Sequence, residues 1–172
     1  DGVASSTFTG SSYSGFYDID SLSRPVGIGG NPPPNTLQAF EGLLDEVRIY
    51  NRVVSASEIQ ALYRTGAVAV NFSRKMVVSD GLVGYWTFNG QDMVGTTTAY
   101  DRSGSGLHGT LINGMQAAAL VLGKVGQALY FDGTTAEITI PNLDTYATRS
   151  ISVWIKRGRE PANSSGWFDG II

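Results

Sequence analysis

Short runs that alternate apolar and polar residues, separated by glycine-rich turns, recur along this chain of 172 residues. The clearest run, Leu43 to Tyr50, has the period of two that places alternate side chains on opposite faces of a β-strand. The chain contains 22 glycines, and only 16% of its residues are charged, below the ~25% usual for globular domains. We therefore expect an all-β protein with many turns.

Other segments carry signals of strands and turns. Leu82 to Phe88 and Ile151 to Ile155 alternate like the first run, and Val26 to Ile28 is a short strand before a Gly-Gly turn. Residues 128–131 and 136–140 flank Asp132-Gly133-Thr134, which predicts a β-hairpin. Proline has no amide hydrogen, so Pro32 to Pro34 belong in an exposed loop.

One short helix is expected near residues 56–64. Ser55 and Glu58 form a capping box, in which each side chain accepts the backbone amide of the other residue. An apolar stripe at positions i, i+3 and i+4 follows, made of Ile59, Leu62 and Tyr63. Gly66 is placed to end the helix.

Charge and composition disfavour several function classes. The formal net charge is −3, whereas proteins that bind nucleic acid carry a basic surface that neutralises phosphates. No apolar run approaches the ~20 residues that span a bilayer, so we expect no membrane insertion. Cysteine is absent, which excludes disulfides and thiolate chemistry. Gly104 to Gly109 fits the GxGxxG pattern, but the Asn-Gly turn after it favours a loop over a dinucleotide site.

The sequence offers little for catalysis. His108 is the single histidine, and it lies in a glycine-rich loop without a nucleophile motif. Adjacent Asp45 and Glu46 point to opposite faces of their strand and cannot flank one glycosidic bond. Asp18 and Asp20 share a strand parity but lie in a serine-rich loop. We expect no enzyme activity.

Asp45, Asp101 and Ser103 are the candidate metal ligands. By parity, Asp45 shares a face with Val47 and Ile49, where a carboxylate needs a cation or backbone donors. The loop from Asp101 supplies a carboxylate, the Ser103 hydroxyl and carbonyls freed by glycine, which are oxygen ligands of the kind Ca²⁺ takes. A plain turn stabilised by the same side chain is the alternative.

Three tryptophans could offer rings for sugar stacking. Trp86 and Trp154 lie inside alternating strands, which favours core or sheet packing, whereas Trp167 follows a polar loop and is the better candidate for exposure. Asn71 and Asn163 begin glycosylation sequons.

Several motifs together resemble laminin-G-like jelly-roll domains of the concanavalin A-like lectin/glucanase superfamily. Two of them, Gly42 to Arg52 and Ser55 to Tyr63, resemble the end of such a domain. The others resemble its beginning, in the family's order: Leu82 to Phe88, Asp101 to Thr110, Gly123 to Gly133 and Ser150 to Ile155. The resemblance implies an antiparallel jelly-roll sandwich.

The order of these motifs is unusual, because the ending precedes the beginning. We therefore expect residues 1–66 to be the C-terminal half of one module, 67–80 a linker, and 81–172 the N-terminal half of the next module in a tandem array. The two halves can pack as one circularly permuted or incomplete sandwich, since each alone exposes an apolar face and unpaired edges. The missing central strands should leave exposed edges.

The resemblance also implies a function. Family members commonly bind Ca²⁺ and glycans or protein partners at rim loops, and the positions carried over are Asp45 and Asp101. The chain lacks the clustered-acid strand motif of the glucanase members. We expect a non-catalytic binding or adhesion module of a secreted or cell-surface, bacterial multi-module protein, with neighbouring modules as further partners. The alternative is a structural spacer in a surface protein or a secreted carbohydrate-active enzyme.

Overall fold

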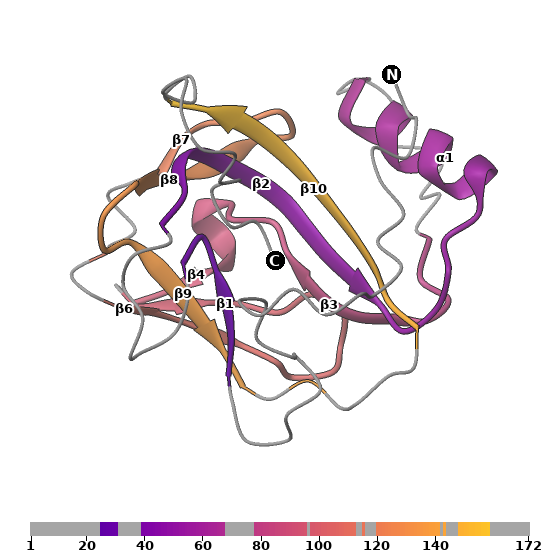
Figure 1. Ribbon diagram of the computed structural model, residues 1–172, viewed down its shortest axis with the longest axis horizontal. Coiled ribbons are helices and arrows are strands. Elements are labelled where there is room, and N and C mark those ends of the chain that lie inside the picture. The colour runs from indigo at the N-terminus through magenta and orange to yellow at the C-terminus, as the bar shows by residue number, and fades with distance from the viewer. Residues whose placement is uncertain are drawn as a thin grey trace, which may run out of the picture.

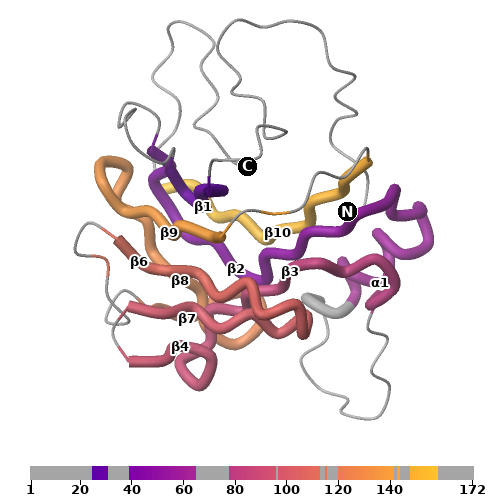
Figure 2. The backbone as a smooth tube through the Cα atoms, turned by 90° about the horizontal axis from the view of Figure 1, so that it is seen from below, coloured from indigo at the N-terminus to yellow at the C-terminus, as the bar shows by residue number. Residues whose placement is uncertain are grey.

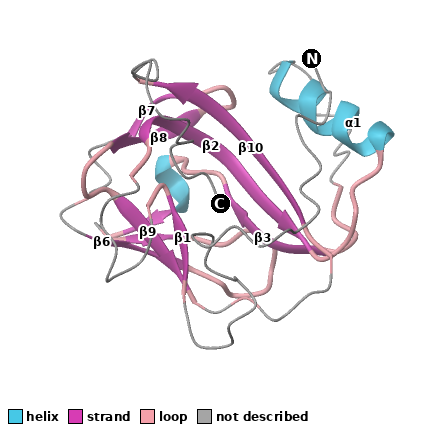
Figure 3. Ribbon diagram, in the orientation of Figure 1, coloured by secondary structure: helices cyan, strands magenta, loops and turns pink. Residues whose placement is uncertain are grey.

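The computed structural model describes residues 25–30, 39–67, 78–95, 97–112, 115, 120–141, 143 and 148–158. These residues form two antiparallel β-sheets, one α-helix and one short 3-10 helix, Gly90–Asp92 (Figures 1 and 3). The expected all-β sandwich with one short helix is therefore confirmed. Several sequence predictions lie outside the described residues: Asp18, Asp20, Pro32 to Pro34, Asn71, Asn163, Trp167 and most of the 67–80 linker.

The first sheet contains five short strands. Its order is β1-β9-β6-β5-β4, with every neighbouring pair antiparallel. The strands are β1 (Val26–Ile28), β9 (Glu137–Ile140), β6 (Gly109–Ile112), β5 (Thr98–Ala99) and β4 (Met93–Val94).

The second sheet is built around its longest strand, β2. Its order is β10-β2-β8-β7, and β3 also pairs with β2, beyond the end of β8 (Figure 2). The strands are β10 (Ser150–Arg157), β2 (Glu41–Tyr50), β8 (Gln127–Asp132), β7 (Leu120–Leu122) and β3 (Leu82–Trp86).

Strands from the two parts of the chain share both sheets. β1 pairs with β9, which follows it by more than a hundred residues, and β2 pairs with β10, β8 and β3. Both early strands therefore draw their hydrogen-bond partners from the later part of the chain.

The apolar faces of the two sheets form one hydrophobic core. Val47 and Ile49 from β2 lie in the same buried cluster as Phe131 of β8 and Ile138 of β9, and Val153 of β10 packs against it. The largest side chains are almost fully removed from water, which is the main favourable contribution to folding.

The predicted hairpin around Asp132 is wrong. β8 lies in the second sheet and β9 in the first, so the turn carries the chain from one sheet to the other. The Asp132 carboxylate stabilises this turn: its Oδ1 accepts the amides of Thr134, Thr135 and Ala136 at 2.8–3.0 Å. These bonds form a wider turn than the two-residue loop of a tight hairpin.

The face predicted for Asp45 by simple alternation is also wrong. Glu46 has a φ of 56°, and the register between β2 and β10 shifts between Ser152 and Trp154, which marks a β-bulge. The extra residue puts Leu44, rather than Asp45, on the core side together with Val47. Asp45 therefore lies on the outer face of the second sheet.

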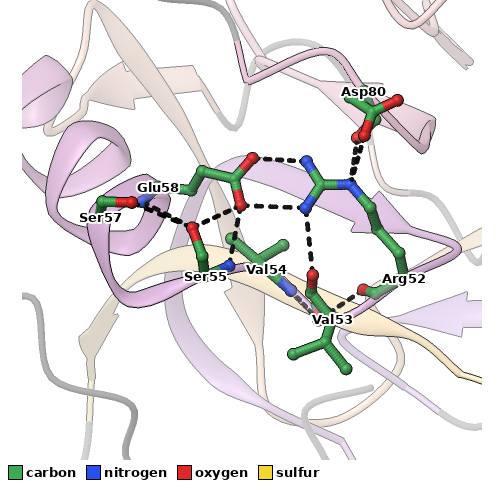
Figure 4. Close-up of polar contacts among 8 residues, drawn as sticks. Arg52, Val53, Val54, Ser55, Ser57, Glu58 and Asp80 are labelled. Atoms are coloured by element: carbon green, nitrogen blue, oxygen red, sulfur yellow. Dashed lines mark hydrogen bonds and ion pairs between the residues drawn. The ribbon is translucent and has the colours of Figure 1, made fainter.

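The helix α1 (Ala56–Ala67) begins with the predicted capping box (Figure 4). The Ser55 amide donates to Glu58 Oε2 at 2.8 Å, and the Glu58 amide donates to Ser55 Oγ at 3.4 Å. The expected end at Gly66 is wrong by one residue, because the helix continues to Ala67.

Arg52 extends the capping box into a junction of three segments. Its guanidinium donates to both Glu58 carboxylate oxygens, at 2.9 and 2.6 Å, and its Nε donates to the Asp80 carbonyl at 2.9 Å (Figure 4). The Arg52 hydrogen bond lowers the pKa of Glu58 to about 2. Ser150, at the start of β10, donates to the Arg52 carbonyl at 2.8 Å. Residues far apart in sequence are thereby joined where β2 leaves the sheet.

Candidate functional site

Asp101 organises the loop between β5 and β6. Its Oδ1 accepts the amides of Tyr85 and Ser103 at 3.0 and 2.8 Å. Its Oδ2 accepts the Ser103 hydroxyl at 2.8 Å and the Leu107 amide at 3.0 Å. This buried carboxylate therefore receives four donors from its own loop and from β3, which is the arrangement expected of a structural turn.

Asp45 lies on the outer face of β2, beneath the turn that joins β7 and β8. Its Oδ2 accepts the Val125 amide at 2.8 Å, while Oδ1 is buried without a hydrogen-bond partner among the described residues. Burial, with a smaller contribution from Glu46, raises the pKa of Asp45 to about 6, against the opposing effect of the Val125 amide.

Asp45 and Asp101 have different partners, in the β7–β8 turn and in the β5–β6 loop respectively. Ser103 accompanies Asp101, to which it donates. Within the described ranges, no three Asp, Glu or His side chains are grouped so that they could hold a metal ion. Calcium binding by Asp45, Asp101 and Ser103 stays a prediction, and the turn explains Asp101 and Ser103 without a metal.

A pair of thermal melts tests the calcium prediction. If these residues hold Ca²⁺, calcium at a hundred times its Kd stabilises the folded state by about 2.7 kcal/mol over chelator. Differential scanning calorimetry in millimolar CaCl₂ and in EDTA measures the difference, with MgCl₂ as the control for ionic strength. Superimposable melting curves in all three buffers would contradict the calcium prediction. Stabilising the turn would then be the role of Asp101.

His108 has a structural environment. Its Nδ1 accepts the Asp101 amide at 3.1 Å, and its ring stacks on Tyr100 with the centroids 4.3 Å apart. Gly109 begins strand β6, so no helix N-terminus follows the GxGxxG pattern that a dinucleotide site would need. The β5–β6 loop is therefore stabilised by contacts between its own residues.

Two further buried acids are paired with arginine. Glu46 Oε2 accepts from Arg48 and, at 2.7 Å, from the Tyr85 hydroxyl. Asp92 accepts from Arg102 and, at 2.5 Å, from Thr87 Oγ1. Each buried carboxylate therefore has an arginine as counter-charge and a hydroxyl group as a second donor, which offsets the cost of burying it.

The tryptophans divide between the core and the surface. Trp86 is fully buried, as predicted, and its Nε1 donates to the Leu107 carbonyl at 3.0 Å. Trp154 is half-buried on the outer face of the second sheet, where its ring lies 5.4 Å from the Tyr63 ring of α1. The Lys124 ammonium lies 5.1 Å from the centre of the Trp154 ring.

The outer face of the second sheet gathers aromatic and basic side chains. Lys156, Leu43 and Tyr130 are directly paired across β10, β2 and β8, and Trp154 is two residues from Lys156 on β10. Residues two apart on a strand share a face, so these side chains point the same way as Trp154. We call this surface the outer-face patch, formed by Leu43, Tyr63, Lys124, Tyr130, Trp154 and Lys156.

Much of the outer-face patch is accessible to solvent. Tyr63 and Tyr130 are 39% and 42% exposed, both lysines are exposed, and Leu43 and Trp154 are half-buried. Sequence reasoning missed this surface, although the alternation of β8 puts Tyr130 opposite its core-facing neighbours Leu129 and Phe131. Its members come from five segments, β2, α1, the β7–β8 turn, β8 and β10, which are brought together only in the folded chain.

The described part of the chain contains no helix with the length and apolar character required to cross a membrane.

One family profile matches the first third of the chain. The sequence profile of the concanavalin A-like lectin/glucanases superfamily matches residues 1–60, a stretch that includes β1 and β2. No curated protein and no solved structure matches the chain. The two-sheet antiparallel architecture is consistent with the sandwich of that superfamily.

Proposed function

We propose that this chain is a non-catalytic binding module of an exported, multi-module protein, and that it takes a glycan or a protein ligand. The observation that carries the proposal is the outer-face patch, where aromatic rings and lysines are exposed together on a rigid sheet. Exposed aromatic residues are common at recognition surfaces, because they bring a large contact area with few rotatable bonds.

The contacts of four described acids, three of them buried, support a non-catalytic role. Glycosidases place two carboxyl groups on either side of the scissile bond, ~5–10 Å apart and open to substrate. Here Glu46 and Asp92 are engaged by arginine, and Asp101 and Asp132 by backbone amides. The superfamily similarity of residues 1–60 supports export, and the absence of cysteine fits an exported protein.

The pairing of early with late strands supports a permuted origin. In this proposal, two partial modules pack together around one hydrophobic core. Residues 1–66 are the end of one module, and residues 81–172 are the beginning of the next. The pairing of β1 with β9, and of β2 with β10, β8 and β3, supports this arrangement, in which β1 and β2 supply strands that a module beginning at residue 81 lacks.

A glycan array combined with a hydrolysis assay tests the proposed function. We expect the labelled chain to bind at least one glycan class, and to release no new reducing ends from the glycans it binds. Release of reducing ends that persists after repurification would contradict the non-catalytic role. Absence of any glycan or protein ligand would favour the structural-spacer alternative.

A further inference from the structure

We propose that strand β10 is the interface of a symmetric dimer, in which it pairs antiparallel with β10 of a second copy of this chain. The second sheets of the two copies then form one continuous sheet across a two-fold axis. This inference goes beyond the proposed function, because it concerns an edge of the sheet and not a ligand site.

Strand β10 lies at one end of the second sheet (Figure 1). It pairs with β2 on one side, and no strand in the described ranges pairs with its other side. A strand in this position presents unpaired backbone N–H and C=O groups, which are a template for a further strand. β10 has eight residues, whereas the other strands at the ends of the two sheets, β7, β1 and β4, have three or fewer.

An apolar row runs along the core side of β10. Ile151 pairs with Ile49 and Ile155 with Leu44, and both partners belong to the buried core. Ile151 and Ile155 therefore point to the core side, yet they are 36% and 41% exposed. Val153, between them, is half-buried against the core. The core thus covers this row only in part, and an apolar strand at an open edge favours association.

The sequence of β10 is self-complementary in one register. Opposite residues of an antiparallel pair lie on the same face, so core-side residues must meet core-side residues. Pairing Ile151 with Ile155 of the second copy puts Val153 opposite Val153 on the two-fold axis and matches all three apolar residues. A shift of two residues in either direction instead puts Ile151 opposite Arg157 or Ile155 opposite Arg149.

The outer side of β10 tolerates the same register. It puts Lys156 opposite Ser150 and Trp154 opposite Ser152, so no like charges meet between residues 150 and 156. This strand pair is about 20 Å long and is small beside the ~1,200–2,000 Å² that stable interfaces bury. We therefore expect a weak dimer whose population depends on protein concentration.

Single cysteines test the register, because the chain has none of its own. Val153→Cys puts two thiols opposite each other, with Cα atoms about 4.5–5.5 Å apart, a separation that a disulfide spans. Ile151→Cys is the matched control, since this register puts the two Cα atoms about 14 Å apart. After oxidation with diamide, non-reducing electrophoresis should show about fivefold more covalent dimer for Val153→Cys than for Ile151→Cys.

Sedimentation equilibrium tests the apolar row. We expect the parent to dimerise reversibly, and Ile155→Lys to raise the dimer Kd at least about tenfold, because the dimer contains the new charge twice. Ile151→Glu/Ile155→Lys should restore dimerisation, since each carboxylate then faces an ammonium group of the second copy, whereas Ile151→Lys/Ile155→Lys should not. Leu122→Lys is the control for surface charge and should dimerise like the parent, because Leu122 is 87% exposed on β7, at the opposite end of the sheet.

A parent that stays monomeric at millimolar concentration, or equal cross-linking of the two cysteine variants, would overturn the inference. Pairing of β10 with another segment of the same chain, or with a different protein, would give the same monomeric result. Circular dichroism melts check that the variants fold, and sedimentation of the parent needs no variant. The proposed function is tested separately: a monomer that binds a glycan leaves the binding module standing, and a dimer without any ligand supports this inference alone.

Discussion

Arg48→Met is expected to destabilise the protein by about 3–5 kcal/mol, because it removes one partner of a buried ion pair. The side chains of Arg48 and Glu46 are only 10% and 3% exposed. Arg48 also donates to the Tyr85 hydroxyl at 2.8 Å, and its guanidinium lies 4.1 Å from the centre of the Tyr85 ring. Methionine keeps most of the volume but leaves the Glu46 carboxylate with the Tyr85 hydroxyl as its remaining side-chain donor.

Urea denaturation monitored by tryptophan fluorescence measures this loss. The control is the double variant Glu46→Gln/Arg48→Met, which removes both charges of this pair. We expect it to be more stable than the sum of the two single changes predicts, since residues in one network couple by about 0.5–3 kcal/mol. A midpoint for Arg48→Met within error of the parent would show that solvent screens Glu46 in the folded state.

The same network shows where sequence reasoning succeeds and where it fails. Alternation predicted a strand from Leu43 to Tyr50, and the structure has β2 from Glu41 to Tyr50. Alternation cannot predict the bulge at Glu46, because the left-handed φ there is imposed by pairing with β10 and by the contacts of its side chain. The error in the face of Asp45 follows directly from that one residue.

Sequence patterns predicted the structure reliably where the contacts join residues that are close together in the sequence. The capping box of α1 depends on residues three apart, and the structure contains it almost as the sequence indicates. The turn at Asp132 looks equally local, but whether it closes a hairpin depends on which sheet accepts β9. The outer-face patch is the extreme case, since its side chains come from β2, α1, β8, β10 and the β7–β8 turn.

Asp45→Asn is expected to stabilise the protein above pH 7 and to have little effect near pH 4. Burial raises the pKa of Asp45 from 3.8 to about 6, so the folded state holds its proton more tightly than the unfolded state does. The stability contributed by that proton is fully present below pH 3.8 and is lost as the pH rises through 6. At about 1.4 kcal/mol per pKa unit, the ionised carboxylate costs on the order of 2–3 kcal/mol at neutral pH.

The measurement is the free energy of unfolding of parent and variant from pH 4 to 8, in EDTA so that the proton alone is varied. Asparagine keeps an oxygen that can accept the Val125 amide, so the comparison isolates the charge. Subtracting the two curves cancels the titration of other acids, including Glu137, whose pKa burial also raises. The variant should gain stability over the parent as the pH rises from 5 to 7. If the difference in unfolding free energy between variant and parent is constant or decreases from pH 5 to 7, Asp45 is ionised in the folded protein throughout this range, as a calcium ligand would be. In that case, adding CaCl₂ should stabilise the parent and leave the stability of Asp45→Asn unchanged.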